Sequence, residues 1–392
     1  MHSRQSQTIS ILERLVSFPS LPGQPTKEII GYIQSELNQQ GIDCTLSFDH
    51  TGERANLFAT IGPQIKGGVL LNGHTDVVPV AGQSWSTDPF TLTRTDNKLY
   101  GRGSVDMKGF LACMIASVPV WKESTLSKPV HLAFTFDEEI GGFGMPVLLD
   151  SMKQMNVQPD AVIVGEPTEC QLITGHKGGF EMRTEITGHE VHSCNPVKGV
   201  NAISIAAALI NKIDEIGRRF SASPVTDSPF DPPYSTFNIG TIEGGMARNA
   251  TAGRCQFNWE LRQMPGVDGE KIIDEIRSYA QDELLPPMRA VDKNTDIKII
   301  TEAPVPPMDD RNADKAAELI CQLTGTNSRG VVSFGSDAGY FSDAGFSTVL
   351  YGPGSINRAH KPDEYITAEE IDQGLEFMDK LAAYLTNAHT GG

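Results

Sequence analysis

Long hydrophobic runs are absent from this 392-residue sequence, which argues against a membrane protein. The longest apolar stretches, such as 68–71 and 161–164, are far shorter than the roughly 20 residues that a membrane-spanning helix needs. Near the start, Glu13 and Arg14 interrupt the apolar stretch at 9–15, whereas a signal peptide needs an unbroken one. We therefore expect a cytoplasmic protein.

Positive charge is also scarce, since 32 Lys and Arg stand against 49 Asp and Glu, for a net charge of −17. A protein that binds nucleic acid needs a basic surface to contact phosphates. We expect neither a nucleic-acid partner nor a membrane partner. The acidic balance mainly favours solubility and does not identify a substrate.

Paired cysteines are missing as well. The chain has six cysteines and no C-x-x-C pair, so the sequence suggests neither a disulfide framework nor a zinc site built on thiolates. A metal site in this chain would therefore use histidine and carboxylate ligands.

What the first part of the chain does contain is an alternation of strand and helix patterns. Such alternation is typical of α/β proteins, in which helices cover both faces of a sheet. The helical patterns lie at 8–16, 26–40, 107–120 and 142–152, and the strand patterns at 55–61, 69–72, 131–136 and 161–164.

The middle of the chain has a different pattern. Residues 180–187, 235–243 and 253–261 alternate polar and apolar side chains, which predicts half-buried strands of an antiparallel sheet. Helical patterns at 202–220 and 270–284 lie between or after them. Together these elements predict a compact α+β unit.

A proline-rich stretch at 303–308 predicts a stiff connector. After it the helix and strand patterns resume, ending in a helix at 368–385. We therefore expect an α/β catalytic domain at 1–179 and 303–392, interrupted by an inserted α+β domain at 180–302.

Residues able to bind metal stand at the ends of the predicted strands. Each has an ordinary explanation when taken alone: Asp106 could cap a helix, and the pair Glu138 and Glu139 could be solvated. The carboxyl ends of parallel strands meet at one edge of a sheet, however, so side chains at these ends can converge. Their coincidence predicts a metal site. The residues are His74, Asp76, Asp106, Asp137, Glu138, Glu139, Glu166 and His360.

Nitrogen and oxygen ligands without thiolate suit zinc first, with cobalt or manganese as substitutes. Two ions about 3.5–4 Å apart need a bridging carboxylate. One further carboxylate must stay off the metals, to move protons between the water and the leaving group. Adjacent Glu138 and Glu139 can divide these roles, and Asp76 is placed to hold the imidazole of His74.

Several sequence motifs, spread over nearly the whole chain, match those of one known family in the same order. The sequence resembles the acetylornithine deacetylase / succinyl-diaminopimelate desuccinylase family of co-catalytic zinc hydrolases. This resemblance implies a mixed-sheet catalytic domain with helices on both faces and an inserted lid and dimerisation domain. The motifs are GHTDVVP at 73–79, YGRGSVDMKG at 100–109, DEE at 137–139, GEPT at 165–168, GHKG at 175–178, GVNAI at 199–203 and GPGSINRAHKPDEY at 352–365.

The resemblance implies roles for the metal-binding residues. His74 and Glu166 would hold one ion, Glu139 and His360 the other, and Asp106 would bridge them.

It also implies roles around the metals. Asp76 would orient His74, and Glu138 would be the general base and acid. His192 would reach the substrate carbonyl from the neighbouring subunit, which implies a homodimer formed through the inserted domain.

Asn249 and Arg262 would contact the oxyanion and the substrate carboxylate, although either also fits an ordinary loop or surface residue. Gly335 and Ser336 belong to a Gly-Ser/Thr-Asp element that the family uses for substrate contact.

The function expected from the resemblance is hydrolysis of N-acetyl-L-ornithine to L-ornithine and acetate, in arginine biosynthesis. Acetylornithine deacetylases often have Thr-Glu-Ala where this chain has GSDA at 335–338, which keeps other substrates open. The nearest alternatives are a succinyl-diaminopimelate desuccinylase, an aminoacylase and a small carboxypeptidase. A non-catalytic binding protein on the same fold is the alternative from another class, and it would be expected to lack a ligand or the base.

Overall fold

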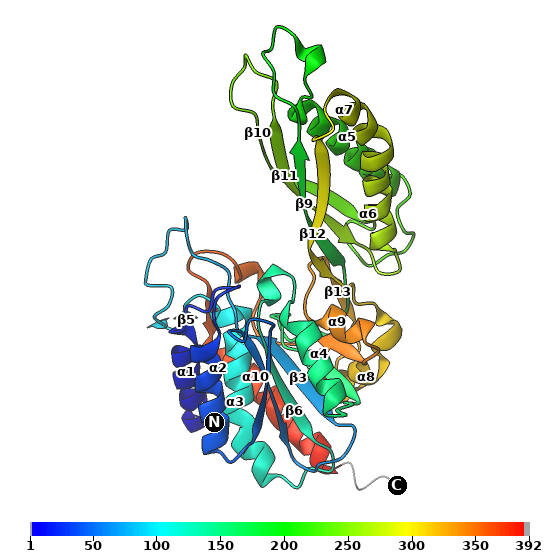
Figure 1. Ribbon diagram of the computed structural model, residues 1–392. Coiled ribbons are helices and arrows are strands. Elements are labelled where there is room, and N and C mark those ends of the chain that lie inside the picture. Colours follow the sequence, from blue (N-terminus) through cyan, green and yellow to red (C-terminus); the bar gives the residue numbers. More distant parts are fainter. Residues whose placement is uncertain (1, 388–392) are drawn as a thin grey trace. The chain divides into compact units, whose positions relative to one another are not determined.

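The structure, a computed structural model, describes residues 2–387 and divides into two units (Figure 1). Unit 1 consists of the described residues up to Gly175, of Met308–Val331 and of the described residues from Ser336 onward; unit 2 consists of His176–Pro307 and Val332–Gly335. The predicted mixed α/β class is confirmed. The role of residues 180–302 as a lid and dimerisation domain stays a prediction, and residues 1 and 388–392 of the predicted ranges lie outside the described part.

Unit 1 is built on an eight-stranded mixed sheet in the order β1-β2-β6-β3-β7-β14-β8-β13. Strands β6, β3, β7 and β14 run parallel, so their carboxyl ends lie at one edge of the sheet. Strands β1 and β2 are antiparallel to their neighbours. The strands are β1 (Cys44–Phe48), β2 (Ala55–Ile61), β3 (Val69–His74), β6 (Val130–Thr135), β7 (Ala161–Val164), β8 (Ile173–His176), β13 (Gly330–Val332) and β14 (Thr348–Leu350).

Helices cover both faces of this sheet. Helices α1, α2, α3, α8 and α10 share one hydrophobic core on the first face, while α4 and α9 pack on the other (Figure 1). The central strands β3, β6 and β7 are buried at every position, which explains their mostly apolar sequence. The helices are α1 (His2–Val16), α2 (Lys27–Gln39), α3 (Gly109–Glu123), α4 (Gly144–Gln154), α8 (Asp314–Thr324), α9 (Ala338–Asp343) and α10 (Ala368–Asn387).

Helix α3 is the central helix of the first face. Within residues 2–387, the stretch Ser104–Glu123 is the one helix long and apolar enough to span a membrane, and 89% of its most apolar window is buried inside the protein. Its contacts with α1 and α10 account for that composition, because a helix covered on several sides is apolar all round. It is a core helix of unit 1.

Unit 1 also contains a small three-stranded sheet, and short helical turns occur in both units. The small sheet joins the segment before Asp106 to the segment after His360, since β15 pairs with β5. Its strands are β4 (Thr93–Thr95), β5 (Lys98–Tyr100) and β15 (Tyr365–Thr367). The turns are Ser104–Lys108, Glu138–Ile140, Pro196–Lys198, Tyr279–Leu284, Asp310–Asn312 and Ile356–Arg358.

Unit 2 is an antiparallel four-stranded sheet, in the order β10-β11-β9-β12, with helices on one face. Its core is separate from that of unit 1 and includes the alternate residues Cys255, Phe257 and Trp259 of β11. The elements are β9 (Gly178–Thr187), α5 (Ala202–Ser221), β10 (Thr236–Gly244), β11 (Arg254–Gln263), α6 (Gly269–Ser278), α7 (Leu285–Val291) and β12 (Asp296–Val305).

The predicted connector at 303–308 is wrong at its start. Strand β12 continues to Val305, and Ala303 pairs with Glu181 of β9 after a β-bulge. Because β12 lies at the edge of the sheet, Pro304 can occupy it without interrupting the sheet's hydrogen bonds. The alternation of β12 is weak, which is why the sequence did not reveal it.

Candidate metal centre

The parallel strands bring the predicted metal-binding residues to one edge of the unit 1 sheet. His74 is the last residue of β3, Glu139 lies in the turn after β6, and Glu166 follows β7. Asp106 lies in the turn before α3, and His360 lies in the loop between β14 and β15. The predicted convergence of these strand ends is therefore present in the structure.

The carboxylate of Asp106 lies between two imidazoles. Its Oδ1 is 3.1 Å from His74 Nε2, and its Oδ2 is 3.1 Å from His360 Nε2. Glu139 Oε2 is 3.0 Å from the same nitrogen of His360, and Glu166 Oε1 is 4.0 Å from His74 Nε2. Candidate ligand atoms of His74, Asp106 and Glu139 all lie within 4.8 Å of one another. Each carboxylate oxygen of Asp106 thus faces a different imidazole, as a bridging ligand requires.

The burial and charge of these groups fit a bound cation. His74, Asp106 and Glu166 are all buried, although each is ionisable. Within the described chain, Glu166 Oε1 has no hydrogen-bond partner. Burial and the nearby negative charge of Asp106 raise the pKa of Glu166 to about 8. Divalent cations would compensate this concentration of negative charge, and Glu166 Oε1 could coordinate one of them.

The two histidines have raised pKa values in this setting. Hydrogen bonds to Asp106 and Glu139 raise the pKa of His360 to about 10. Burial acts to lower the pKa of His74, but the Asp106 hydrogen bond and surrounding carboxylates raise it well above its ordinary value. A metal ligand must be the neutral imidazole, so metal binding would displace these protons.

Asp76 lies beside the ring of His74 and also contacts the turn that carries Glu138 and Glu139. The His74 ring nitrogen Nδ1 lies 2.9 Å from the backbone oxygen of Asp76 and 3.7 Å from its carboxylate. The carboxylate instead accepts hydrogen bonds from the backbone N–H groups of Glu138 (3.2 Å) and Glu139 (3.1 Å). Asp76 therefore contacts both the His74 ring and the turn that carries the two glutamates.

Glu138 lies in the same cluster without contacting either imidazole at ion-pair distance. Burial raises its pKa well above the ordinary value; the positive charge of His74 opposes this, and the carboxylates around it, first Glu166, reinforce it. The preceding Asp137 anchors the turn, since its side chain accepts from Gly23 N–H at 2.8 Å and pairs with Arg54. A partly buried carboxylate that prefers its proton is suited to proton transfer.

One buried carboxylate of the cluster, Asp337, was not among the predicted site residues. Its Oδ2 accepts a hydrogen bond from Thr135 at 2.7 Å, and within residues 2–387 its Oδ1 has no partner. Burial raises its pKa to about 6, against the lowering effects of Thr135 and His74. Its position directly after Gly335 and Ser336 was the available signal. Ser336 is itself buried and belongs to unit 1.

The remaining predicted contacts lie in unit 2. His192 and Asn249 are exposed and adjacent there, because His192 bridges to Ala250 and Ser193 N–H donates to Asn249 O at 3.0 Å. Arg262 forms a 2.7 Å ion pair with Glu260 within β11. Gly335 also belongs to unit 2. Their roles toward a substrate stay predictions.

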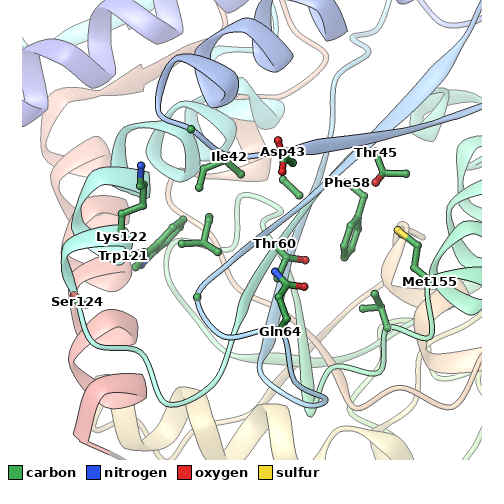
Figure 2. Close-up of a pocket in the computed structure, with 15 residues that line it drawn as sticks. Ile42, Asp43, Thr45, Phe58, Thr60, Gln64, Trp121, Lys122, Ser124 and Met155 are labelled. Atoms are coloured by element: carbon green, nitrogen blue, oxygen red, sulfur yellow. The ribbon is translucent and has the colours of Figure 1, made fainter.

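A separate cavity of about 750 Å³ lies at the opposite end of the parallel strands (Figure 2). Its lining includes Phe58 and Thr60 of β2, Trp121 of α3, and Met155 after α4. Residues 60 and 61 of β2 pair with the first residues of β6, whereas the metal-binding residues follow the strand carboxyl ends. This cavity is therefore distinct from the candidate metal centre.

The sequence of residues 70–384 matches peptidase family M20/M25/M40. The chain is 31% identical over 363 residues to an acetylornithine deacetylase of Pasteurella multocida (strain Pm70), covering 91% of each protein. It is also 31% identical over 380 residues to an acetylornithine deacetylase of Klebsiella pneumoniae (strain 342), covering 95% of this chain and 96% of the relative.

Solved structures share the fold at lower identity. The metallo-carboxypeptidase Sso-CP2 of Sulfolobus solfataricus, of the M20 family, aligns with a TM-score of 0.75 and 19% identity, over 97% of this chain and 99% of that one. The YXEP protein of Bacillus subtilis, described as a dinuclear metal-binding peptidase from the M20 family, aligns with a TM-score of 0.64 and 14% identity, over 99% of each chain. The chain belongs to peptidase family M20/M25/M40 and is a metallohydrolase of that family.

Proposed function

We propose that this chain binds two divalent metal ions and hydrolyses the amide bond of N-acetyl-L-ornithine, giving L-ornithine and acetate. The observation that carries the metal assignment is the carboxylate of Asp106, whose two oxygens face different imidazoles. The substrate assignment is supported by relatives named acetylornithine deacetylase that align over nearly the whole chain. The proposal includes a role in arginine biosynthesis and a cytoplasmic location.

In this proposal His74 and Glu166 hold one ion, Glu139 and His360 hold the other, and Asp106 bridges them. The donor set of imidazole and carboxylate favours zinc, with cobalt or manganese as substitutes. Bound ions would supply Lewis acidity and would lower the pKa of a water held beside them.

Glu138 is the proton carrier of the reaction. It takes a proton from the attacking water and gives it to the amide nitrogen as the carbon–nitrogen bond breaks. Asp76 keeps Glu138 in place by accepting its backbone N–H and that of Glu139.

His192 provides a hydrogen bond to the oxygen that becomes negative in the transition state, and it does so from a second copy of the chain. Three exposed apolar side chains on unit 2 support a homodimer. They are Ile242 on β10, Met246 in the turn after it, and Ile203 on α5, which are 51%, 92% and 42% exposed. Because β10 is an edge strand, it can pair with the same strand of another chain.

A second candidate is hydrolysis of another N-acyl amino acid or of a small peptide. The observation that favours it is the GSDA sequence at 335–338, which differs from the Thr-Glu-Ala common in acetylornithine deacetylases. Ser336 and Asp337 are both buried in unit 1.

The test is a turnover panel with zinc or cobalt added: acetylornithine, succinyl-diaminopimelate, acetylmethionine and a dipeptide. We expect acetylornithine to have the highest kcat/KM. A higher value for another member would replace the substrate assignment and leave the metal assignment standing. Metal binding without hydrolysis of any member would instead indicate a binding protein on this fold.

A further inference from the structure

A buried carboxylate outside the proposed ligand set connects two loops of the metal centre. Glu364 lies four residues after His360, and it is 1% exposed. Its Oε1 accepts the backbone N–H groups of Val105 (3.0 Å) and Asp106 (3.2 Å), and its Oε2 accepts that of Gly103 (3.1 Å). The loop that carries His360 thus holds the backbone of the segment that carries Asp106.

Arg102 extends these contacts back to His360. Its guanidinium pairs with Glu364 at 2.6 Å, and neither side chain is more than 1% exposed. The same guanidinium donates to Gln83 Oε1 (2.5 Å) and to the backbone oxygen of Lys361 (3.4 Å). Gln83 in turn donates its amide to the backbone oxygen of His360 at 2.9 Å.

The backbone of His360 needs such support. Its φ is +60°, in the left-handed region that residues other than glycine seldom adopt. A side chain at such a position keeps its direction only if the surrounding contacts hold the backbone there. The hydrogen bond from Gln83 to the carbonyl of His360 is one contact of this kind.

We propose that Glu364 and Arg102 are positioning residues, which together hold Asp106 and His360 in the arrangement that two metal ions require. This inference rests on the proposed function. Glu364 acts on Asp106 through the backbone N–H of Asp106, and on His360 through Arg102 and Gln83. Neither Glu364 nor Arg102 is a metal ligand in this proposal.

Glu364→Gln is the informative change, because it keeps the size of the side chain and converts one acceptor oxygen into a donor. The new NH2 group must face either the N–H groups of Val105 and Asp106 or the donors of Gly103 and Arg102. Loss of such outer contacts typically weakens metal affinity by about 10–100-fold. Since Asp106 serves both ions, both should bind more weakly.

The experiment is a titration of the metal-free, full-length protein with cobalt, by calorimetry and by the visible absorption of the bound ion. The wild type should bind two ions per chain with a characteristic spectrum. Glu364→Gln should bind both about 10–100-fold more weakly, with shifted absorption bands. The matched control is Glu370→Gln, which also breaks an ion pair to an arginine, Arg358, but touches neither Asp106 nor the carbonyl of His360.

Gln83→Ala gives an independent test should Glu364→Gln fail to fold. Gln83 is only half-buried, and its loss removes the contact to His360 while leaving Glu364 on Asp106. This substitution should weaken the binding of one cobalt ion and leave the affinity of the other site unchanged.

Wild-type affinity in Glu364→Gln, or an equal loss in Glu370→Gln, would overturn the inference. If Glu364→Gln does not fold, two unchanged sites in Gln83→Ala would overturn it. A wild type that binds no cobalt would instead contradict the proposed function.

Discussion

Replacing Glu138 by glutamine separates proton transfer from metal binding. Glu138 makes no ion-pair contact with His74 or His360 within the described residues, whereas Glu139 lies 3.0 Å from His360 Nε2. Glutamine matches glutamate in size and resembles its protonated form, but it cannot take a proton from water. Glu138→Gln should therefore keep both ions and lose turnover, and Glu139→Gln should lose one ion.

The expected loss of turnover follows from the role of the carboxylate. General-base action is typically worth about 10²–10⁴-fold in rate, which corresponds to about 2.7–5.4 kcal/mol of transition-state stabilisation. The KM should change little, because the missing interaction forms in the transition state.

The same substitution should increase the thermal stability of the metal-free protein, although it lowers turnover. Burial raises the pKa of Glu138, so its ionised form destabilises the folded, metal-free protein at pH values above its unfolded pKa. A neutral glutamine removes that penalty. The metal-free Glu138→Gln protein should melt at a higher temperature than the metal-free wild type at neutral pH.

The assay combines kcat and KM on acetylornithine, metal content by elemental analysis after dialysis, and melting of the metal-free proteins. Our assignment of roles would be refuted if Glu138→Gln released an ion while Glu139→Gln kept both and lost only turnover. A Glu138→Gln enzyme with wild-type kcat would show that another group moves the proton.

Three further predictions concern other parts of the structure. Asp106→Ala should weaken both metal sites in a calorimetric titration, and loss of only one site would contradict a bridging role. His192→Ala should lower kcat by roughly 10²–10³-fold with metal content intact. Mixing His192→Ala chains with Glu138→Ala chains should restore activity if His192 acts across subunits; no recovery after verified subunit exchange would exclude that. Burial lowers the pKa of His131, so the stability that its neutral form contributes is complete above its ordinary pKa of about 6.5 and declines below it. Denaturant unfolding at about pH 7.5 and 5.5 should show a smaller decline for His131→Gln than for the wild type, and equal declines would contradict this account.

Much of the fold was predictable from local patterns. The largely apolar runs at 69–72, 131–136 and 161–164 correspond to β3, β6 and β7, because strands covered on both faces are apolar at most positions. Weaker elements such as β12 were missed, since an edge strand of mixed composition lacks a clear period. Ionisable residues at or just beyond the ends of apolar strands, such as His74 and Glu166, were the local signal of the candidate site.

Most residues of the candidate metal centre were predictable from sequence, because the carboxyl ends of parallel strands share an edge; Asp337 was not. How these side chains meet depends on the folded structure. It gave each oxygen of Asp106 a different imidazole and turned the carboxylate of Asp76 toward the glutamate turn. It also buried Glu364 against a segment 258 to 262 residues away. The motif at 352–365 contains Glu364 but does not reveal its role, because burial and pairing over such a separation depend on how the loops pack together after folding.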